Sequence, residues 1–115
     1  MILQEIKEQL DTINSNNWYG MVDNIENLDV FDYIVFFRDK TVIDKTKHTL
    51  SDYYVVAIVQ ENFIEEDFIL EVIEKMQNIK GMRVCNNDIY YEYTKKPNTD
   101  TILEIASISF VKARK

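Results

Sequence analysis

Cysteine, histidine, glycine and proline are all scarce in this sequence. Its 115 residues include one cysteine (Cys85), one histidine (His48), two glycines and one proline. A single cysteine excludes an internal disulfide, and one cysteine with one histidine cannot supply a His/Cys zinc site. Two glycines are too few for a glycine-rich phosphate-binding loop. We expect Cys85 to be a buried thiol and His48 a surface residue.

Long apolar runs are absent as well. No stretch approaches the ~18 apolar residues that a membrane span needs. The acidic residues Glu5, Glu8 and Asp11 interrupt the N-terminal apolar residues, so no signal peptide is expected. Hydrophobic residues still make up 46% of the chain, which is ordinary for a globular protein. The sequence predicts one α+β domain, residues 1–115, without a membrane partner.

Positive charge is in short supply, with 13 Lys and Arg against 20 Asp and Glu and a net charge of −7. This balance disfavours nucleic acid as a nonspecific partner. The distribution is uneven: residues 61–78 carry six acids and one base, and residues 79–115 carry four acids and seven bases. If the helices are acidic and the C-terminal sheet is basic, these surfaces would attract copies of the chain to one another. The simpler interpretation of the uneven charge is that these are solvated surfaces of mixed sign.

Residues 51–80 give the clearest structural signal. Tyrosine, valine and isoleucine dominate residues 53–59, which predicts a strand that is apolar on both faces. Residues 65–80 predict a helix with acids in its first turn, Asn62 as a candidate cap, and Lys80 and Gly81 at its end. Its apolar stripe consists of Phe68, Ile69, Val72, Ile73, Met76 and Ile79.

Shorter patterns predict the remaining elements. The predicted fold is α+β, a mainly antiparallel sheet of five to six strands with two amphipathic helices, in the order α-β-β-β-α-β-β-β. The apolar residues of the last strand change parity, which predicts either a bulge near residues 106–107 or burial on both faces. Residues 18–29 show no clear pattern and are expected to form a packed connection. The expected elements are a helix at 2–13, strands at 30–38, 41–50, 53–60, 82–85, 89–94 and 101–113, and turns at 38–41 and 86–88.

Carboxylates are the remaining candidates for a chemical site. Glu65, Glu66 and Asp67, together with Glu61, are a possible cation site, but acids at a helix N-terminus are already explained by the macrodipole. Asp52 and Glu61 flank a strand, as metal-binding acids of nucleases do, but a lysine at a matching spacing is missing. We therefore expect no catalytic residue, no metal site and no cofactor.

The predicted sheet has more apolar surface than two helices can cover. An antiparallel sheet usually has one wet face, yet the strand at 53–60 is apolar on both. The second face must be covered by residues 14–29 or by another subunit, and we expect a subunit. The expected interface residues are Tyr54, Val56, Ile58 and Phe36, whereas the smaller residues Val55, Ala57 and Val59 would receive a helix. On this prediction, Tyr54→Asp blocks assembly and leaves the subunit folded.

Tyrosine is abundant in the predicted sheet. Five of the seven tyrosines fall there: Tyr53, Tyr54, Tyr90, Tyr91 and Tyr93. Basic residues among aromatics are also typical of single-strand binding, but the acidic balance and the strand preference of tyrosine favour packing. Tyrosine is enriched at protein interfaces too, which is compatible with assembly.

The predicted elements are, in order, a leading helix, a β-meander that ends in the strand at 53–60, a helix at 65–80 and a closing sheet at 89–112. This arrangement resembles that of the tail-terminator and tail-completion proteins of long-tailed bacteriophages and phage-tail-like bacteriocins. The similarity lies in element order and length from residue 30 onward. It implies a non-enzymatic subunit of a virion or tail-like particle, assembled in the bacterial cytoplasm. The implied partners are further copies of itself in a ring, commonly a hexamer, the tail-tube protein and a neck or connector protein.

Two other classes of function stay open. A small acidic inhibitor or mimic would bind a basic partner, as the net charge suggests. An enzyme with a carboxylate site would respond to a divalent metal. Ring assembly instead predicts defined oligomers or polymerisation with tail protein.

Overall fold

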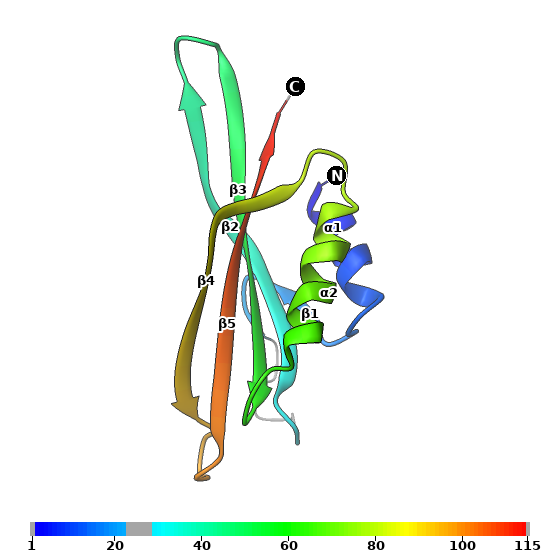
Figure 1. Cartoon of the computed structure of the whole chain (residues 1–115), viewed down its shortest axis with the longest axis vertical. Helices are drawn as coiled ribbons and strands as arrows, with labels where there is room; N and C mark the ends of the chain where they lie inside the picture. Colours follow the sequence, from blue (N-terminus) through cyan, green and yellow to red (C-terminus); the bar gives the residue numbers. More distant parts are fainter. Residues whose placement is uncertain (1, 23–28, 115) are drawn as a thin grey trace.

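The computed structural model describes residues 2–22 and 29–114 of an elongated molecule with extents of 52 × 25 × 24 Å. Both helices lie on one face of a long twisted sheet, and one hairpin extends well beyond them (Figure 1). The elements are α1 (Ile2–Asp11), β1 (Asn17–Tyr19), β2 (Asp32–Asp44), β3 (Thr49–Glu61), α2 (Glu66–Gln77), β4 (Arg83–Lys95) and β5 (Ile102–Ala113).

The sheet has the order β1-β2-β3-β5-β4, so β3 is the central strand. The short β1 pairs parallel with β2, and all other pairings are antiparallel. The pairing of β4 with β5 is irregular between Val84 and Ile89. If the parts of β4 on either side are counted separately, the order is α-β-β-β-α-β-β-β with six strands. The predicted α+β class and mostly antiparallel sheet are confirmed.

The predicted boundaries before α2 are wrong in one respect. Residues 38–41 form no turn, because Arg38 pairs with Tyr54 and Lys40 pairs with Tyr53, which leaves Asp39 as the extra residue of a β-bulge. The chain turns between Asp44 and Thr49, where His48 has a φ of 55°. The predicted strand at 41–50 is therefore the end of β2, the turn and the start of β3. Sequence patterns also missed β1, which has only three residues.

Helix α2 is shorter than predicted at both ends. Glu65 is its N-cap residue without a side-chain cap bond, and Asn78 is its C-cap. The candidate cap Asn62 instead occupies a turn after β3 with a φ of 71°. Gly81 also has a positive φ, 83°, but in the turn that leads into β4 rather than directly after the helix.

Both helices bury their apolar stripes against one face of the sheet. Ile6 and Leu10 of α1 and the stripe of α2 pack on β2, β3 and β5. Strand β5 pairs with β3 without a break from Leu103 to Ala113, so the suggested bulge near 106–107 is wrong. The change of apolar parity reflects burial on both faces, since Ala106, Ile108 and Phe110 face the helices while Leu103 belongs to a second cluster.

Candidate functional site

The four residues predicted to form the interface lie in the core under the helices. Tyr54, Val56, Ile58 and Phe36 are between 0% and 3% exposed and belong to the cluster that packs against α1 and α2. Burial raises the pKa of the Tyr54 hydroxyl, with a smaller contribution from the charge of Asp52. The prediction that this face meets a partner is wrong. The helices cover the face that carries the larger side chains. Val55, Ala57 and Val59 alternate with these residues along β3 and therefore face the opposite side of the sheet.

The opposite side of the sheet, here called the second face, is partly covered by the chain itself. Phe31, Tyr33, Val59 and Leu103 form a small cluster, and Trp18 and Val22 from the segment 14–29 pack against it. Residues 23–28 of that segment lie outside the described residues. Beyond this cluster, the second face continues with half-buried residues: Phe37, Val55, Ala57, Ser107 and Ser109. In the register of the strands, Ala57 lies beside Ser107, and Val55 lies between Phe37 and Ser109. Small side chains therefore occupy the centre of this part of the second face.

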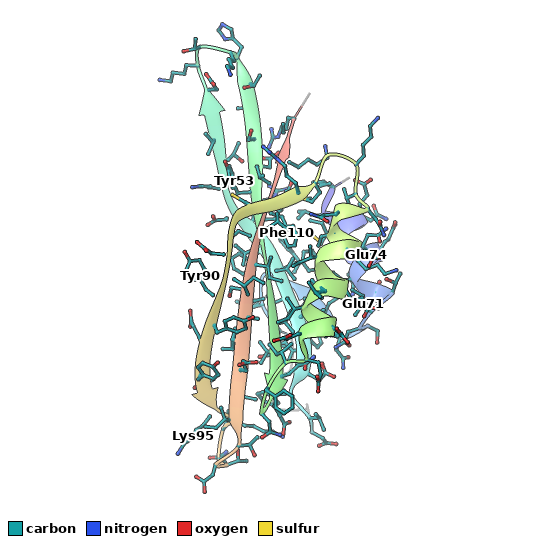
Figure 2. The ribbon with its side chains drawn as sticks, viewed as in Figure 1. Tyr53, Glu71, Glu74, Tyr90, Lys95 and Phe110 are labelled. Atoms are coloured by element: carbon teal, nitrogen blue, oxygen red, sulfur yellow. The ribbon has the colours of Figure 1, made fainter. Side chains whose placement is uncertain are left out.

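Strand β4 forms one edge of the sheet and carries three exposed tyrosines. Tyr90, Tyr91 and Tyr93 are 63%, 47% and 63% exposed. Tyr90 projects outward from β4 in Figure 2. Tyr93 donates its hydroxyl to Glu104 at 2.8 Å, and this hydrogen bond raises the pKa of the tyrosine. An edge strand of 13 residues leaves one row of backbone groups without a strand partner in the sheet, which suits pairing with another chain.

Residues 40–53, here called the arm, form the hairpin that extends beyond the helices (Figure 1). Every residue from 38 to 49 is exposed except the half-buried Asp44. Val42 and Ile43 are 41% and 65% exposed, although residues 44–49, which include the turn between the two strands, are all polar. The ammonium of Lys40 lies 5.0 Å from the ring centre of Tyr53 at the root of the arm.

An ion pair fixes the root of the arm to β5. Arg114 donates from Nε and Nη2 to the two carboxylate oxygens of Asp52 at 2.6 and 2.9 Å, and Thr41 donates to the same carboxylate at 2.8 Å. The hydrogen bonds from Arg114 and, to a smaller extent, the one from Thr41 lower the pKa of Asp52 below its usual 3.8. This bidentate geometry is the strong form of an arginine–carboxylate contact.

This ion pair predicts how stability depends on pH. A carboxyl group whose pKa is lower in the folded than in the unfolded protein stabilises the fold above the unfolded value, and this contribution is lost as the pH falls through the folded pKa. We expect the difference in unfolding free energy between the wild type and Asp52→Asn to shrink as the pH falls from about 5 through the lowered pKa of Asp52, measured by urea unfolding. A difference that stays constant with pH would show that the ion pair does not stabilise the fold.

A second ion pair lies at the other end of β3. Glu61 accepts from the backbone N–H of Phe31 at 2.7 Å and from Lys96 at 3.1 Å, and these contacts, in that order, lower the pKa of the carboxyl group. Lys96 also donates to the backbone oxygen of Asp29 and lies over the ring of Phe31. The network holds the segment before β2 against the loop between β4 and β5.

These ion pairs account for the carboxylates that the sequence suggested as a metal site. Asp52 and Glu61 lie at opposite ends of β3, and each is bound to a cation of the protein. Glu65, Glu66 and Asp67 begin α2 as predicted. Across residues 2–22 and 29–114, no group of three or more His, Cys, Asp and Glu side chains is placed to hold a metal ion. His48 is exposed, and Cys85 is half-buried rather than fully buried as expected.

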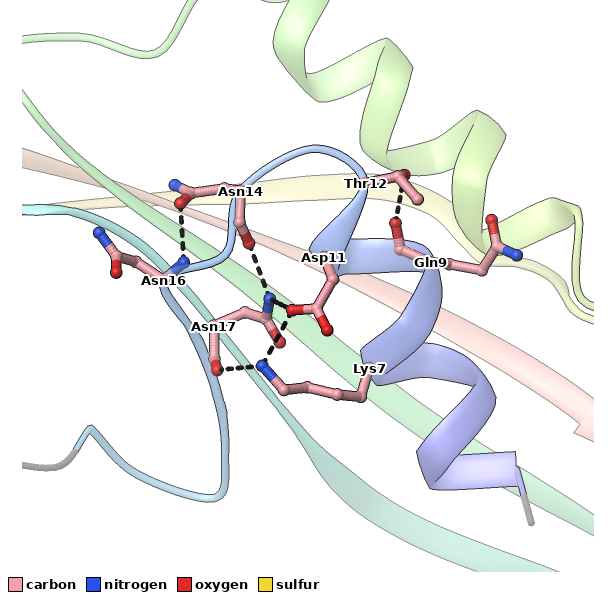
Figure 3. Close-up of polar contacts among 7 residues, drawn as sticks. All are labelled: Lys7, Gln9, Asp11, Thr12, Asn14, Asn16 and Asn17. Carbon is pink, nitrogen blue, oxygen red and sulfur yellow. Dashed lines mark hydrogen bonds and ion pairs between the residues drawn. The ribbon is translucent and has the colours of Figure 1, made fainter.

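A polar network joins the end of α1 to β1 (Figure 3). Asp11 accepts from Lys7 at 3.0 Å and from the amide of Asn17 at 2.8 Å, and these bonds, that from Asn17 first, lower its pKa. Asn17 is 3% exposed, and its Oδ1 atom has no hydrogen-bond partner. It borders an open cavity of about 440 Å³ whose other lining residues are Leu3, Gln4, Lys7, Ser15, Trp18, Tyr19 and Phe36. Because the Oδ1 atom is itself buried, a molecule in the cavity cannot reach it without a rearrangement.

The comparisons with known proteins do not connect this chain to a family. Neither family models nor curated proteins give a significant match. Among the residues that the structure describes, no helix is long and apolar enough to cross a membrane. Function must therefore be inferred from the surfaces described above.

Proposed function

We propose that this protein is a non-enzymatic structural subunit of a phage tail or phage-tail-like particle, similar to a tail terminator that forms a ring, caps the tail tube and joins it to the neck. The proposal rests on the element order that resembles this family and on the surfaces available for assembly. The arm is the single observation that carries it. The exposed edge of β4 and the half-buried residues of the second face are further places where a neighbouring subunit can pack.

The arm supports an assembly role because it adds little to the fold of one subunit. A hairpin of two strands is at best marginally stable in water. Beyond the pairing of Ser51 with Ala113, no third strand of the described residues joins the arm, and its side chains there are exposed except for the half-buried Asp44 and Leu50. A long exposed hairpin is therefore best explained by a contact with another protein, and a tail tube or the next subunit of a ring provides one.

Shortening the arm tests this proposal. We expect that replacing residues 43–50 by Asn-Gly, which favours a two-residue hairpin turn, leaves the circular dichroism of the subunit unchanged but abolishes capping of tail tubes. Capping would be measured by electron microscopy of tubes formed by a tail-tube protein, if the genes beside this one encode such a protein. The matched control, Lys47→Ser, changes the turn without shortening it and should still cap. Normal capping by the shortened variant would contradict the role of the arm, and a gene neighbourhood without tail proteins would contradict the proposed function.

The outer side of α2 favours the second candidate, a small acidic inhibitor of a basic partner. Residues 65–77 carry five acids and one base, and four of these acids are exposed on the helix itself: Glu66, Asp67, Glu71 and Glu74. An inhibitor predicts a tight complex with one basic protein and no ring. Native mass spectrometry of the purified chain, alone and with the tail-tube protein, separates the two functions.

A further inference from the structure

Helix α2 exposes an acidic surface with an apolar residue at its centre. Its outward side, here called the acidic face, consists of Glu66, Asp67, Leu70, Glu71 and Glu74. Leu70 is 62% exposed although it lies on an otherwise charged surface. Glu71 and Glu74 project away from the sheet in Figure 2. An exposed leucine surrounded by carboxylates suits a contact with a basic surface that also has aliphatic parts.

Such a basic surface lies beyond the other end of α2. Lys80, Arg83 and Lys112 line a groove of about 740 Å³ together with Glu5, Gly81 and Ala113, here called the basic groove. None of the three basic side chains has a carboxylate within 4.0 Å in the described part of the chain. The groove adjoins the root of the arm, because Lys112 and Ala113 pair with Asp52 and Ser51.

We propose that the acidic face of one copy docks into the basic groove of a second copy. The two surfaces carry opposite charge, and the basic groove supplies lysine and arginine stems against which Leu70 can pack. A second copy is favoured over nucleic acid as the occupant, because a chain of net charge −7 repels a polyanion outside the groove. This inference deepens the proposed function, on which it rests, by naming the surfaces through which the subunits join.

The position of the two surfaces determines the kind of assembly. They are different parts of the same subunit, so the contact is heterologous, and each added copy leaves one acidic face and one basic groove available. Such a contact closes into a ring if the rotation between copies allows it and otherwise grows as a filament. A symmetric dimer would instead use the same surface twice and would stop at two copies.

Charge reversal with rescue tests the contact. We expect the groove variant Lys80→Glu with Arg83→Glu, and the helix variant Glu66→Lys with Glu71→Lys and Glu74→Lys, each to self-associate at least about tenfold more weakly than the wild type in sedimentation velocity at low salt. An equimolar mixture of the two should associate again, because both possible contacts then join opposite charges. The control variant Asp100→Lys reverses an exposed charge in the loop between β4 and β5, outside both surfaces, and should associate like the wild type.

The contact is overturned if the wild type stays monomeric at every concentration, if either variant associates like the wild type, or if the mixture does not recover. These results are distinct from a failure of the proposed function. Rescue in the mixture without any binding to tail tubes would support the contact and reject the tail role. Capping of tail tubes that neither variant affects would support the tail role and reject the contact.

Discussion

Replacing Phe110 by alanine is expected to lower the free energy of unfolding by about 3–5 kcal/mol. Phe110 is fully buried and is the largest of the completely buried side chains. It lies on β5 opposite Tyr54 and Val84, in the cluster covered by the helices. The loss combines the transfer of the ring out of water with the cavity that remains between a sheet and two helices that cannot collapse fully.

Urea unfolding followed by circular dichroism measures this loss, and the tyrosine on the edge strand provides the control. Tyr90 is 63% exposed, so Tyr90→Ala should change the unfolding free energy by less than about 0.5 kcal/mol. A loss below about 1 kcal/mol for Phe110→Ala would mean that the helices do not pack on this face of the sheet.

Tyr54→Asp is expected to unfold the subunit rather than to block assembly. Tyr54 is 3% exposed beneath the helices, and an aspartate there would place a charge in the apolar core. The charge of Asp52 already acts on Tyr54 and would oppose a second negative charge, while Arg114 is bound to Asp52 and Arg38 is exposed to solvent. We expect a loss greater than about 4 kcal/mol, which is enough to unfold many domains.

The neighbouring residue on the second face is the matched control. Val55 is half-buried and points away from the helices, so Val55→Asp should cost much less and leave a folded protein. The measurement is again circular dichroism with urea unfolding. A folded Tyr54→Asp protein together with an unfolded Val55→Asp protein would reverse the assignment of the two faces.

Sequence patterns predicted α2 well because Ile69, Val72 and Met76 form one stripe that only a helix can produce. The patterns could not predict which face of β3 meets the helices. Tyr54 and Val56 lie on one face and Val55 and Val59 on the other, and all four residues are apolar. The assignment depends on where α1 and α2 dock, which is a property of distant residues such as Ile6.

The bulge at Asp39 was not predictable from the sequence either. The charged residues 38–40 fit a turn as well as they fit an irregular strand.

The elements that carry the candidate surfaces were partly predictable. The tyrosines of β4 and the acids of α2 are visible in the sequence, and both lie on exposed elements as the patterns suggest. The basic groove was not predictable, because it combines the turn after α2 with the end of β5, which lie about 30 residues apart in the chain.

The position of β5 in the sheet affects how this protein folds during synthesis. Strand β5 lies between β3 and β4, and its pairing joins Ser51 to Ala113, near the end of the described chain. Until β5 leaves the ribosome, the edge of β3 that pairs with β5 is unpaired, and β4 has no neighbouring strand. A nascent chain that lacks β5 therefore exposes apolar strands to other nascent chains, and its sheet can close only after β5 has been synthesised.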